Sequence, residues 1–188
     1  MTTTGSAGPT ATTRQGGDGR GAVRVEDVYD THVDDLWAAC TTPERLARWI
    51  ARVSGDLRVG GRVQAVFTST WSGELVVEVC ERPHHLLLTS APGPEQTEIE
   101  LWLTAEGPRT RLVVEERGVP AGAVAPYAAG WQVHLEDLAT CLVTGAAVHP
   151  GGWSESVVAA GWQERWAGLL PTARADVADS GIGDVGAG

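Results

Sequence analysis

The sequence predicts an α+β fold in which a curved antiparallel sheet closes around one long helix. Two observations carry this prediction. Consecutive strand-like runs separated by turn signals are followed by a long helical pattern near residue 130. The apolar residues of that pattern recur at the three-to-four spacing of a single buried stripe: Trp131, Leu135, Leu138 and Leu142. This arrangement leaves a hollow between sheet and helix wherever the side chains are small.

The first elements of the fold are a strand and two short helices. Residues 1–22 have the Thr, Gly, Ser and Ala composition of a disordered tail. Residues 23–28 alternate with period two, which predicts a strand. One helical face follows, formed by Val33, Leu36, Trp37 and Cys40. Residues 42–44 then supply an N-cap, a first-turn proline and an acid for a second short helix that ends near Trp49.

A meander of strands comes next. Glycine and proline turn signals separate the expected strands, which cover residues 63–67, 73–81, 86–90, 98–104 and 109–117. With the long helix, they predict one domain over residues 23–146. Three segments lie outside this domain: the tail 1–22, an extension 147–171 and a second tail 172–188.

The extension carries a second helical stripe that ends at Pro171. Its apolar residues are Val158, Trp162, Trp166 and Leu169. Two tryptophans on one stripe need a partner. Packing back on the domain, a homodimer interface and a lid over the cavity all satisfy that need.

Composition excludes several classes of protein. The chain has 188 residues and a formal net charge of −10, which disfavours nucleic acid and anionic membranes as partners. Every basic residue is arginine, so no lysine can form a Schiff base or bind phosphate in a P-loop. No run approaches the roughly 18 apolar residues of a membrane span. We expect a cytoplasmic protein that needs no cofactor.

Metal and disulfide sites are not expected either. The chain has three cysteines: Cys40, Cys80 and Cys141. Because their number is odd and their neighbours are apolar, we expect buried free thiols. His84 and His85 are adjacent at a strand end, so they point to opposite sides and make a structural zinc site improbable.

Several local motifs, taken in order, resemble those of a known family. They are residues 36–44 (Leu-Trp-Ala-Ala-Cys-Thr-Thr-Pro-Glu), Trp49, Gly60-Gly61, residues 73–83, residues 110–112, Gly118, and Gly130-Trp131 with Leu135 and Leu138. The chain resembles the START-like (SRPBCC) superfamily and, within it, the bacterial homologues of the activator of the heat-shock protein 90 ATPase. The resemblance implies a helix-grip (Bet v 1-like) fold of about seven strands around an apolar cavity.

One carboxylate is a candidate for chemistry in that cavity. Strand alternation places Glu116 on the same inner face as Leu112 and Val114. If Glu116 is desolvated, its pKa rises, and it can act as an acid or base or accept a ligand hydroxyl. The alternative is that Glu116 lies at the strand end in water or pairs with an arginine.

The long helix offers three further candidates near its gripping face. Tyr127 and His134 flank Trp131 at helical spacing, and all three are candidate pocket residues. The structural alternatives are a core anchor for Trp131 and a solvated helix edge for His134. Gly130 is a poor helix former, which suggests close approach of the helix backbone to the sheet or to a ligand.

Apolar residues of the meander complete the expected ligand-binding set. Trp71 stands before an expected turn at Ser72-Gly73, where it either walls the cavity entrance or covers the sheet edge. The whole set is Phe67, Trp71, Ile99, Leu101, Leu112, Val114, Glu116, Tyr127, Trp131 and His134.

Three functions are open at this point. The first is binding of a small apolar molecule in the internal cavity, since members of the superfamily bind lipids, sterols, hormones or polyketides. The second, implied by the family resemblance alone, is a chaperone partner: a stress-response role as a co-chaperone-like regulator of a heat-shock ATPase. The third is a cyclase or dehydratase that uses Glu116, His134 or Tyr127 as acid and base.

Overall fold

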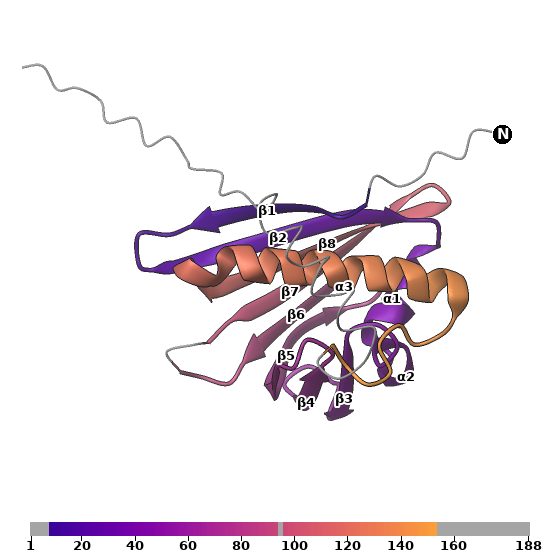
Figure 1. Ribbon diagram of the computed structural model, residues 1–188. Coiled ribbons are helices and arrows are strands. Elements are labelled where there is room, and N and C mark those ends of the chain that lie inside the picture. The colour runs from indigo at the N-terminus through magenta and orange to yellow at the C-terminus, as the bar shows by residue number, and fades with distance from the viewer. Residues whose placement is uncertain (1–7, 94–95, 154–188) are drawn as a thin grey trace, which may run out of the picture.

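A computed structural model describes residues 8–93 and 96–153 and shows a curved antiparallel sheet that holds a long helix (Figure 1). Among the described residues the sheet has eight strands, in the order β1-β2-β8-β7-β6-β5-β4-β3. The strands are β1 Thr10–Gln15, β2 Arg20–Tyr29, β3 Ala51–Gly55, β4 Arg62–Phe67, β5 Ser72–Glu81, β6 His85–Ser90, β7 Glu98–Glu106 and β8 Arg109–Pro120. The helices are α1 Val33–Thr41, α2 Pro43–Leu46 and α3 Val124–Thr144, with a 3₁₀ turn, η1 Ala121–Ala123, before α3.

The connections follow the predicted order. Helices α1 and α2 link β2 to β3, and β3 to β8 form a meander in which each strand pairs with the next. Strand β8 then pairs with β2, which joins the first part of the chain to the last strand. Helix α3 runs along β1, β2 and β8, while β3 to β6 lie farther from it (Figure 1). The predicted α+β helix-grip architecture is confirmed.

Strand alternation decides which side chains of β8 face α3. Leu112 is 0% exposed, Val114 is 1% exposed and Glu116 is 7% exposed. In the neighbouring strand β7, Leu101 pairs with Val114 and Ile99 pairs with Glu116. Glu116 therefore lies on the inner face, as the alternation predicts.

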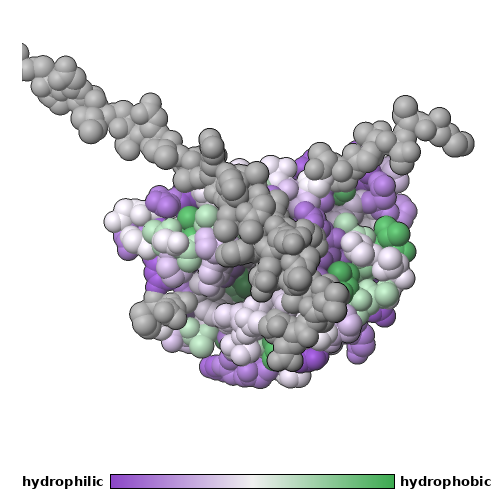
Figure 2. Space-filling view, in the orientation of Figure 1, coloured by the Kyte–Doolittle hydropathy of each residue, from purple (hydrophilic) through white to green (hydrophobic). Residues whose placement is uncertain are grey.

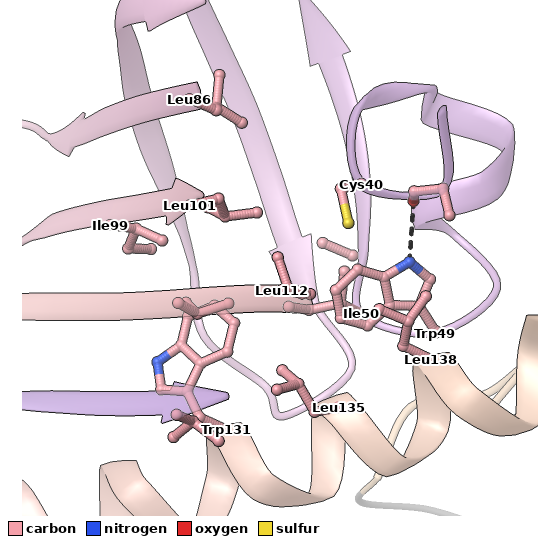
Figure 3. Packing of buried hydrophobic residues seen from close by; sticks show 14 of the residues in the cluster. Cys40, Trp49, Ile50, Leu86, Ile99, Leu101, Leu112, Trp131, Leu135 and Leu138 are labelled. Atoms are coloured by element: carbon pink, nitrogen blue, oxygen red, sulfur yellow. Dashed lines mark hydrogen bonds between the residues drawn. The ribbon is translucent and has the colours of Figure 1, made fainter. Parts of the chain in front are cut away.

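The C-terminal half of α3 is tightly packed. Leu135 and Leu138 are fully buried (Figure 3), and the hydroxyl of Tyr29 on β2 donates to the backbone carbonyl of Leu135 at 3.1 Å. The helix ends at Thr144, and the next residue, Gly145, has a left-handed φ of 69° and donates its N–H to the Cys141 carbonyl at 2.8 Å. Glycine tolerates this conformation, which is common just past a helix C-terminus.

The short helices close one end of the core. The Trp49 indole nitrogen donates to the backbone carbonyl of Ala39 on α1 at 3.0 Å (Figure 3). Trp49 is 1% exposed, so this bond satisfies a buried donor. Helix α2 ends at Leu46, earlier than the expected end near Trp49. The shorter helix lets the chain turn into β3.

Two strands were not predicted. Strand β1 falls within residues 1–22, so the tail assignment is wrong for residues 10–22: the β-branched threonines of β1 pair with β2, and Thr13 is buried. Strand β3 lies between the expected second helix and the first strand of the expected meander, a stretch with no predicted element, and it pairs with β4. In both cases cross-strand pairing outweighs local composition.

Cys80 also departs from prediction, because its thiol is exposed on β5, whereas Cys40 and Cys141 are buried as expected. A register shift in β5 between Val77 and Val79 breaks the alternation just before Cys80.

On the face shown in Figure 2, hydrophilic side chains are interspersed with small hydrophobic patches. No helix within residues 8–93 and 96–153 combines the length and apolarity that a membrane crossing requires. The expected helix with Trp162 and Trp166 and the tail 172–188 lie outside the described residues, as do residues 1–7.

Replacement of Leu138 tests the packing of α3. We expect Leu138→Ala to lower the free energy of unfolding by about 2–5 kcal/mol, because it removes a fully buried side chain. Val143 on the same helix is 89% exposed, so Val143→Ala is the matched control, with an expected change within about 0.5 kcal/mol. Urea unfolding of both variants makes the comparison, and equal losses would contradict the packing described.

Candidate functional site: a cavity beside Glu116

A cavity of about 880 Å³ lies between α3 and the sheet. It forms where β4 to β7 curve away from the N-terminal half of α3 (Figure 1). Its walls come from the β4–β5 hairpin, the segment between β6 and β7, the end of β8 and the first half of α3. This volume falls in the range of small-molecule sites, about 300–1,000 Å³.

Glu116 is the buried carboxyl group of this cavity. One carboxylate oxygen, Oε2, accepts a hydrogen bond from the indole Nε1 of Trp131 at 2.7 Å. Burial raises the pKa of Glu116 to about 7, although hydrogen bonds from Trp131 and Thr97 act in the opposite direction. The alternative in which Glu116 lies in water or pairs with an arginine is wrong. Near neutral pH the group can therefore either donate or accept a proton.

Trp131 combines the two roles that the sequence left open. It is 7% exposed and belongs to the hydrophobic core. It also lines the cavity, and its polar edge faces Glu116. The side chain of Trp131 is thus both a core anchor and part of the cavity wall.

His134 lies in an aromatic wall of the cavity. It stacks on Trp153 with ring centroids 4.4 Å apart, and Phe67 meets it edge-on at 6.1 Å. The alternative of a solvated position at the helix edge is wrong, because His134 is 4% exposed. Burial lowers its pKa to about 3, against a hydrogen bond to the Trp49 backbone that raises it. His134 is therefore neutral near pH 7 and is poorly suited to take up a proton.

Gly130 opens onto the cavity. A Cβ atom at this position would meet no atom within 4 Å, so, of the two alternatives, close approach to the sheet is wrong and approach to a ligand stays a prediction. Gly130 lines the cavity together with Tyr127 and His134, which lie on the same helix face at three and four residues' distance. The missing side chain leaves space between α3 and the sheet.

Seven of the ten expected ligand-binding residues line the cavity: Phe67, Trp71, Ile99, Glu116, Tyr127, Trp131 and His134. Leu101 lines a second, smaller pocket. Leu112 and Val114 line neither space, because they are fully buried in the closed core. Alternation along β8 predicts the face of a residue but not whether α3 packs directly on it.

Trp71 stands at the rim and is 40% exposed. It contacts Phe67 edge-on, with ring centroids 5.3 Å apart and planes at 88°. The turn precedes Trp71, at Thr68 to Thr70, and does not lie at the expected Ser72-Gly73. Trp71 can thus cover part of the cavity mouth.

The sequence did not point to Trp153, Gln96 or Thr97, which also line the cavity. Trp153 lies beyond α3, and its backbone N–H donates to the Thr68 carbonyl at 2.7 Å. That bond brings the end of the described chain back to the β4–β5 turn. The signal in the sequence was a tryptophan, Trp153, within a glycine-rich segment, but no periodic pattern indicated which residues it contacts.

The two adjacent histidines have separate partners. His84 Nδ1 lies 3.0 Å from the Leu103 carbonyl, and His85 Nε2 lies 2.7 Å from a Glu100 oxygen. Among the residues that the structure describes, no three His, Cys, Asp or Glu side chains are grouped to hold a metal ion.

Residues 30–143, well over half of the chain, match the model of one protein family, described as Activator of Hsp90 ATPase homolog 1-like protein. The chain belongs to this family. The match begins just after β2, runs into the last turn of α3 and so includes Glu116, Gly130 and Trp131. No protein among the curated ones matches the sequence.

Solved structures share the fold of this Activator of Hsp90 ATPase homolog 1-like chain. The solution structure of CalU16 from Micromonospora echinospora is 24% identical, with a TM-score of 0.67, over 91% of this chain and 97% of that one. DynU16, from the dynemicin biosynthetic locus, is 29% identical, with a TM-score of 0.62, over 67% of this chain and 48% of that one. A conserved protein of unknown function from Enterococcus faecalis is 17% identical, with a TM-score of 0.63, over 86% of this chain and 88% of that one.

The raised pKa of Glu116 predicts a pH-dependent cost of folding. The folded pKa of about 7 lies above the ordinary value of 4.5, so the folded state keeps a proton that the unfolded state releases. Stability contributed by protonated Glu116 is therefore complete below about pH 4.5 and is lost as the pH rises through about 7. Glu116→Gln keeps a neutral group and escapes this loss.

Urea unfolding at about pH 5 and about pH 8 tests this prediction. From pH 5 to pH 8, we expect Glu116→Gln to gain about 2–3 kcal/mol in the free energy of unfolding relative to the wild-type protein. Glu44 is exposed on α2, so Glu44→Gln controls for the loss of one carboxylate. A stability difference between wild type and Glu116→Gln that is the same at both pH values would show that the pKa is not raised.

Proposed function

We propose that this protein binds a small, mainly apolar molecule that carries at least one hydrogen-bonding group. The observation that carries the proposal is the position of Glu116, a buried carboxyl group on the wall of an otherwise largely apolar cavity. Ligand sites in proteins typically combine apolar walls with a few placed polar groups. Glu116 supplies such a group, and the aromatic rings around it supply flat contact area.

The geometry favours a ligand with a hydroxyl or carbonyl group. Deprotonated Glu116 accepts a hydrogen bond from a hydroxyl, and protonated Glu116 donates one to a carbonyl. A pKa of about 7 makes both forms available near neutral pH. Phe67 and Trp131 offer ring surfaces on which an aromatic or alicyclic ligand can stack.

The relatives support a small organic ligand in a general way. DynU16 belongs to a biosynthetic locus, and a cavity that holds a biosynthetic product or intermediate is consistent with the volume found here. The family description also suggests a heat-shock ATPase as a partner. We favour the small molecule because the described residues build an internal cavity with a specific polar group.

Acid–base chemistry on the bound molecule is a second candidate function. Glu116 and Tyr127 line the same cavity, and the pKa of Glu116 suits proton transfer near neutral pH. His134 is not part of this candidate, since burial keeps it neutral and deprotonated. In this function Glu116 would transfer the proton, and Tyr127 would orient a ligand oxygen.

A cavity-filling variant tests ligand binding. We use N-phenyl-1-naphthylamine, an uncharged fluorophore with one N–H donor, and expect saturable binding with a rise in emission. In Gly130→Phe we expect at least tenfold weaker binding, because a side chain at this open position occupies the cavity. The substitution also removes a glycine that disfavours the helix by up to about 1 kcal/mol.

The matched control is Val143→Phe, which places the same side chain on the exposed end of α3. It is expected to bind the fluorophore as the wild type does. No saturable binding by the wild type, or equal binding by Gly130→Phe, would contradict the proposal. Native mass spectrometry of protein from its own host then identifies the natural ligand by mass.

A further inference from the structure

A second pocket of about 110 Å³ lies behind Trp131. Its walls come from α1, α2 and the segment that follows them, and from strands β3 to β7. Four residues line both this inner pocket and the larger cavity: Phe67, Leu75, Ile99 and Trp131. These four side chains therefore form the boundary at which the two spaces meet.

The two spaces differ in chemistry. The larger cavity contains Glu116, Thr97 and Tyr127, whereas the inner pocket has no charged side chain among its lining residues. Its polar side chains are Thr41 and the thiols of Cys40 and Cys80. Burial raises the pKa of Cys40 to about 12, so that thiol stays neutral. The inner pocket is thus suited to binding an uncharged hydrocarbon group.

Trp131 lies at the boundary between them. Its N–H edge is held by Glu116 on the side of the larger cavity, and its ring also lines the inner pocket. Figure 3 shows Leu86 and Leu101 reaching from the sheet toward Cys40, with Trp131 on α3 below them, and all four residues line the inner pocket. A ligand anchored at Glu116 therefore has an apolar recess directly beyond Trp131.

We propose that the ligand is an amphiphile with two parts. A ring system bearing a hydroxyl or carbonyl group occupies the larger cavity beside Glu116, and an uncharged alkyl branch enters the inner pocket. An apolar cavity of about 150 Å³ binds benzene, so the smaller inner pocket accommodates a branch of about four or five carbon atoms. This inference rests on the proposed function and specifies the class of its ligand.

A homologous series of ligands measures how long an alkyl branch the inner pocket accommodates. The compounds are 2-naphthol and its 6-alkyl derivatives from ethyl to octyl, each competing with N-phenyl-1-naphthylamine. We expect affinity to increase about threefold to fourfold per methylene group up to butyl or pentyl. Beyond pentyl the gain falls below twofold per methylene group. A series without a gain, or one that gains steadily to octyl, would overturn the inference.

A variant inside the inner pocket locates the branch. Ala65 is 1% exposed and lines the inner pocket but not the larger cavity. Ala65→Leu is expected to abolish the gain from the butyl group while the affinity for 2-naphthol stays within twofold of wild type. Val143→Leu is the matched surface control. An undiminished butyl gain in Ala65→Leu would place the branch elsewhere.

Cys80 gives a second readout in the wild-type protein, independent of whether Ala65→Leu folds. Its thiol is exposed and borders the inner pocket. At equal saturation, 6-butyl-2-naphthol is expected to slow alkylation of Cys80 by iodoacetamide at least fivefold relative to 2-naphthol. Equal rates would contradict occupancy of the pocket.

The two proposals fail in different ways. If neither the fluorophore nor 2-naphthol binds, the proposed function fails. If both bind and the alkyl group changes neither the affinity nor the labelling of Cys80, the two-part ligand alone is wrong.

Discussion

The hydrogen bond between Trp131 and Glu116 is the interaction on which the rest of the site depends. It joins α3 to β8 where the two elements begin to separate, and it places a carboxyl group in an apolar setting. Burial of a carboxylate is costly, and the hydrogen bonds from Trp131 and Thr97 compensate only part of that cost. The result is a group that keeps its proton up to neutral pH and remains at the cavity wall.

The two halves of helix α3 have different roles. Its C-terminal half contributes Leu135 and Leu138 to a closed core, where Tyr29 adds a buried hydrogen bond. Its N-terminal half carries Gly130, which leaves space next to the sheet. The first arrangement stabilises the fold and the second keeps a cavity open. Changes in the two halves should therefore affect stability and binding separately.

The structure follows the sequence pattern most closely where periodicity decides the outcome. The alternation of β8 predicted the inner position of Glu116, and the helical stripe predicted Leu135 and Leu138 as core. The pattern failed where a distant partner decides. Strand β1 exists because β2 pairs with it, and His134 is buried because Trp153 stacks on it. Neither pairing can be recognised from a local pattern.

The depth of the cavity could not be predicted from the sequence either. Val114 and Glu116 share one face of β8, yet α3 covers the first closely and leaves the second beside open space. The difference arises from the curvature of the sheet and the angle of the helix. These depend on all the strands together, so no single run of residues encodes them.

The protonation state of Glu116 tests this account most directly. Carbon-13 NMR of the glutamate side-chain carboxyl groups, with Glu116→Gln to assign the signal, follows the titration of this residue alone. The account predicts a midpoint near pH 7, as burial in the cavity wall requires, and a change in that midpoint when N-phenyl-1-naphthylamine is added. A midpoint near the ordinary value of 4.5, unchanged by the fluorophore, would contradict both the burial of Glu116 and its place in a ligand site.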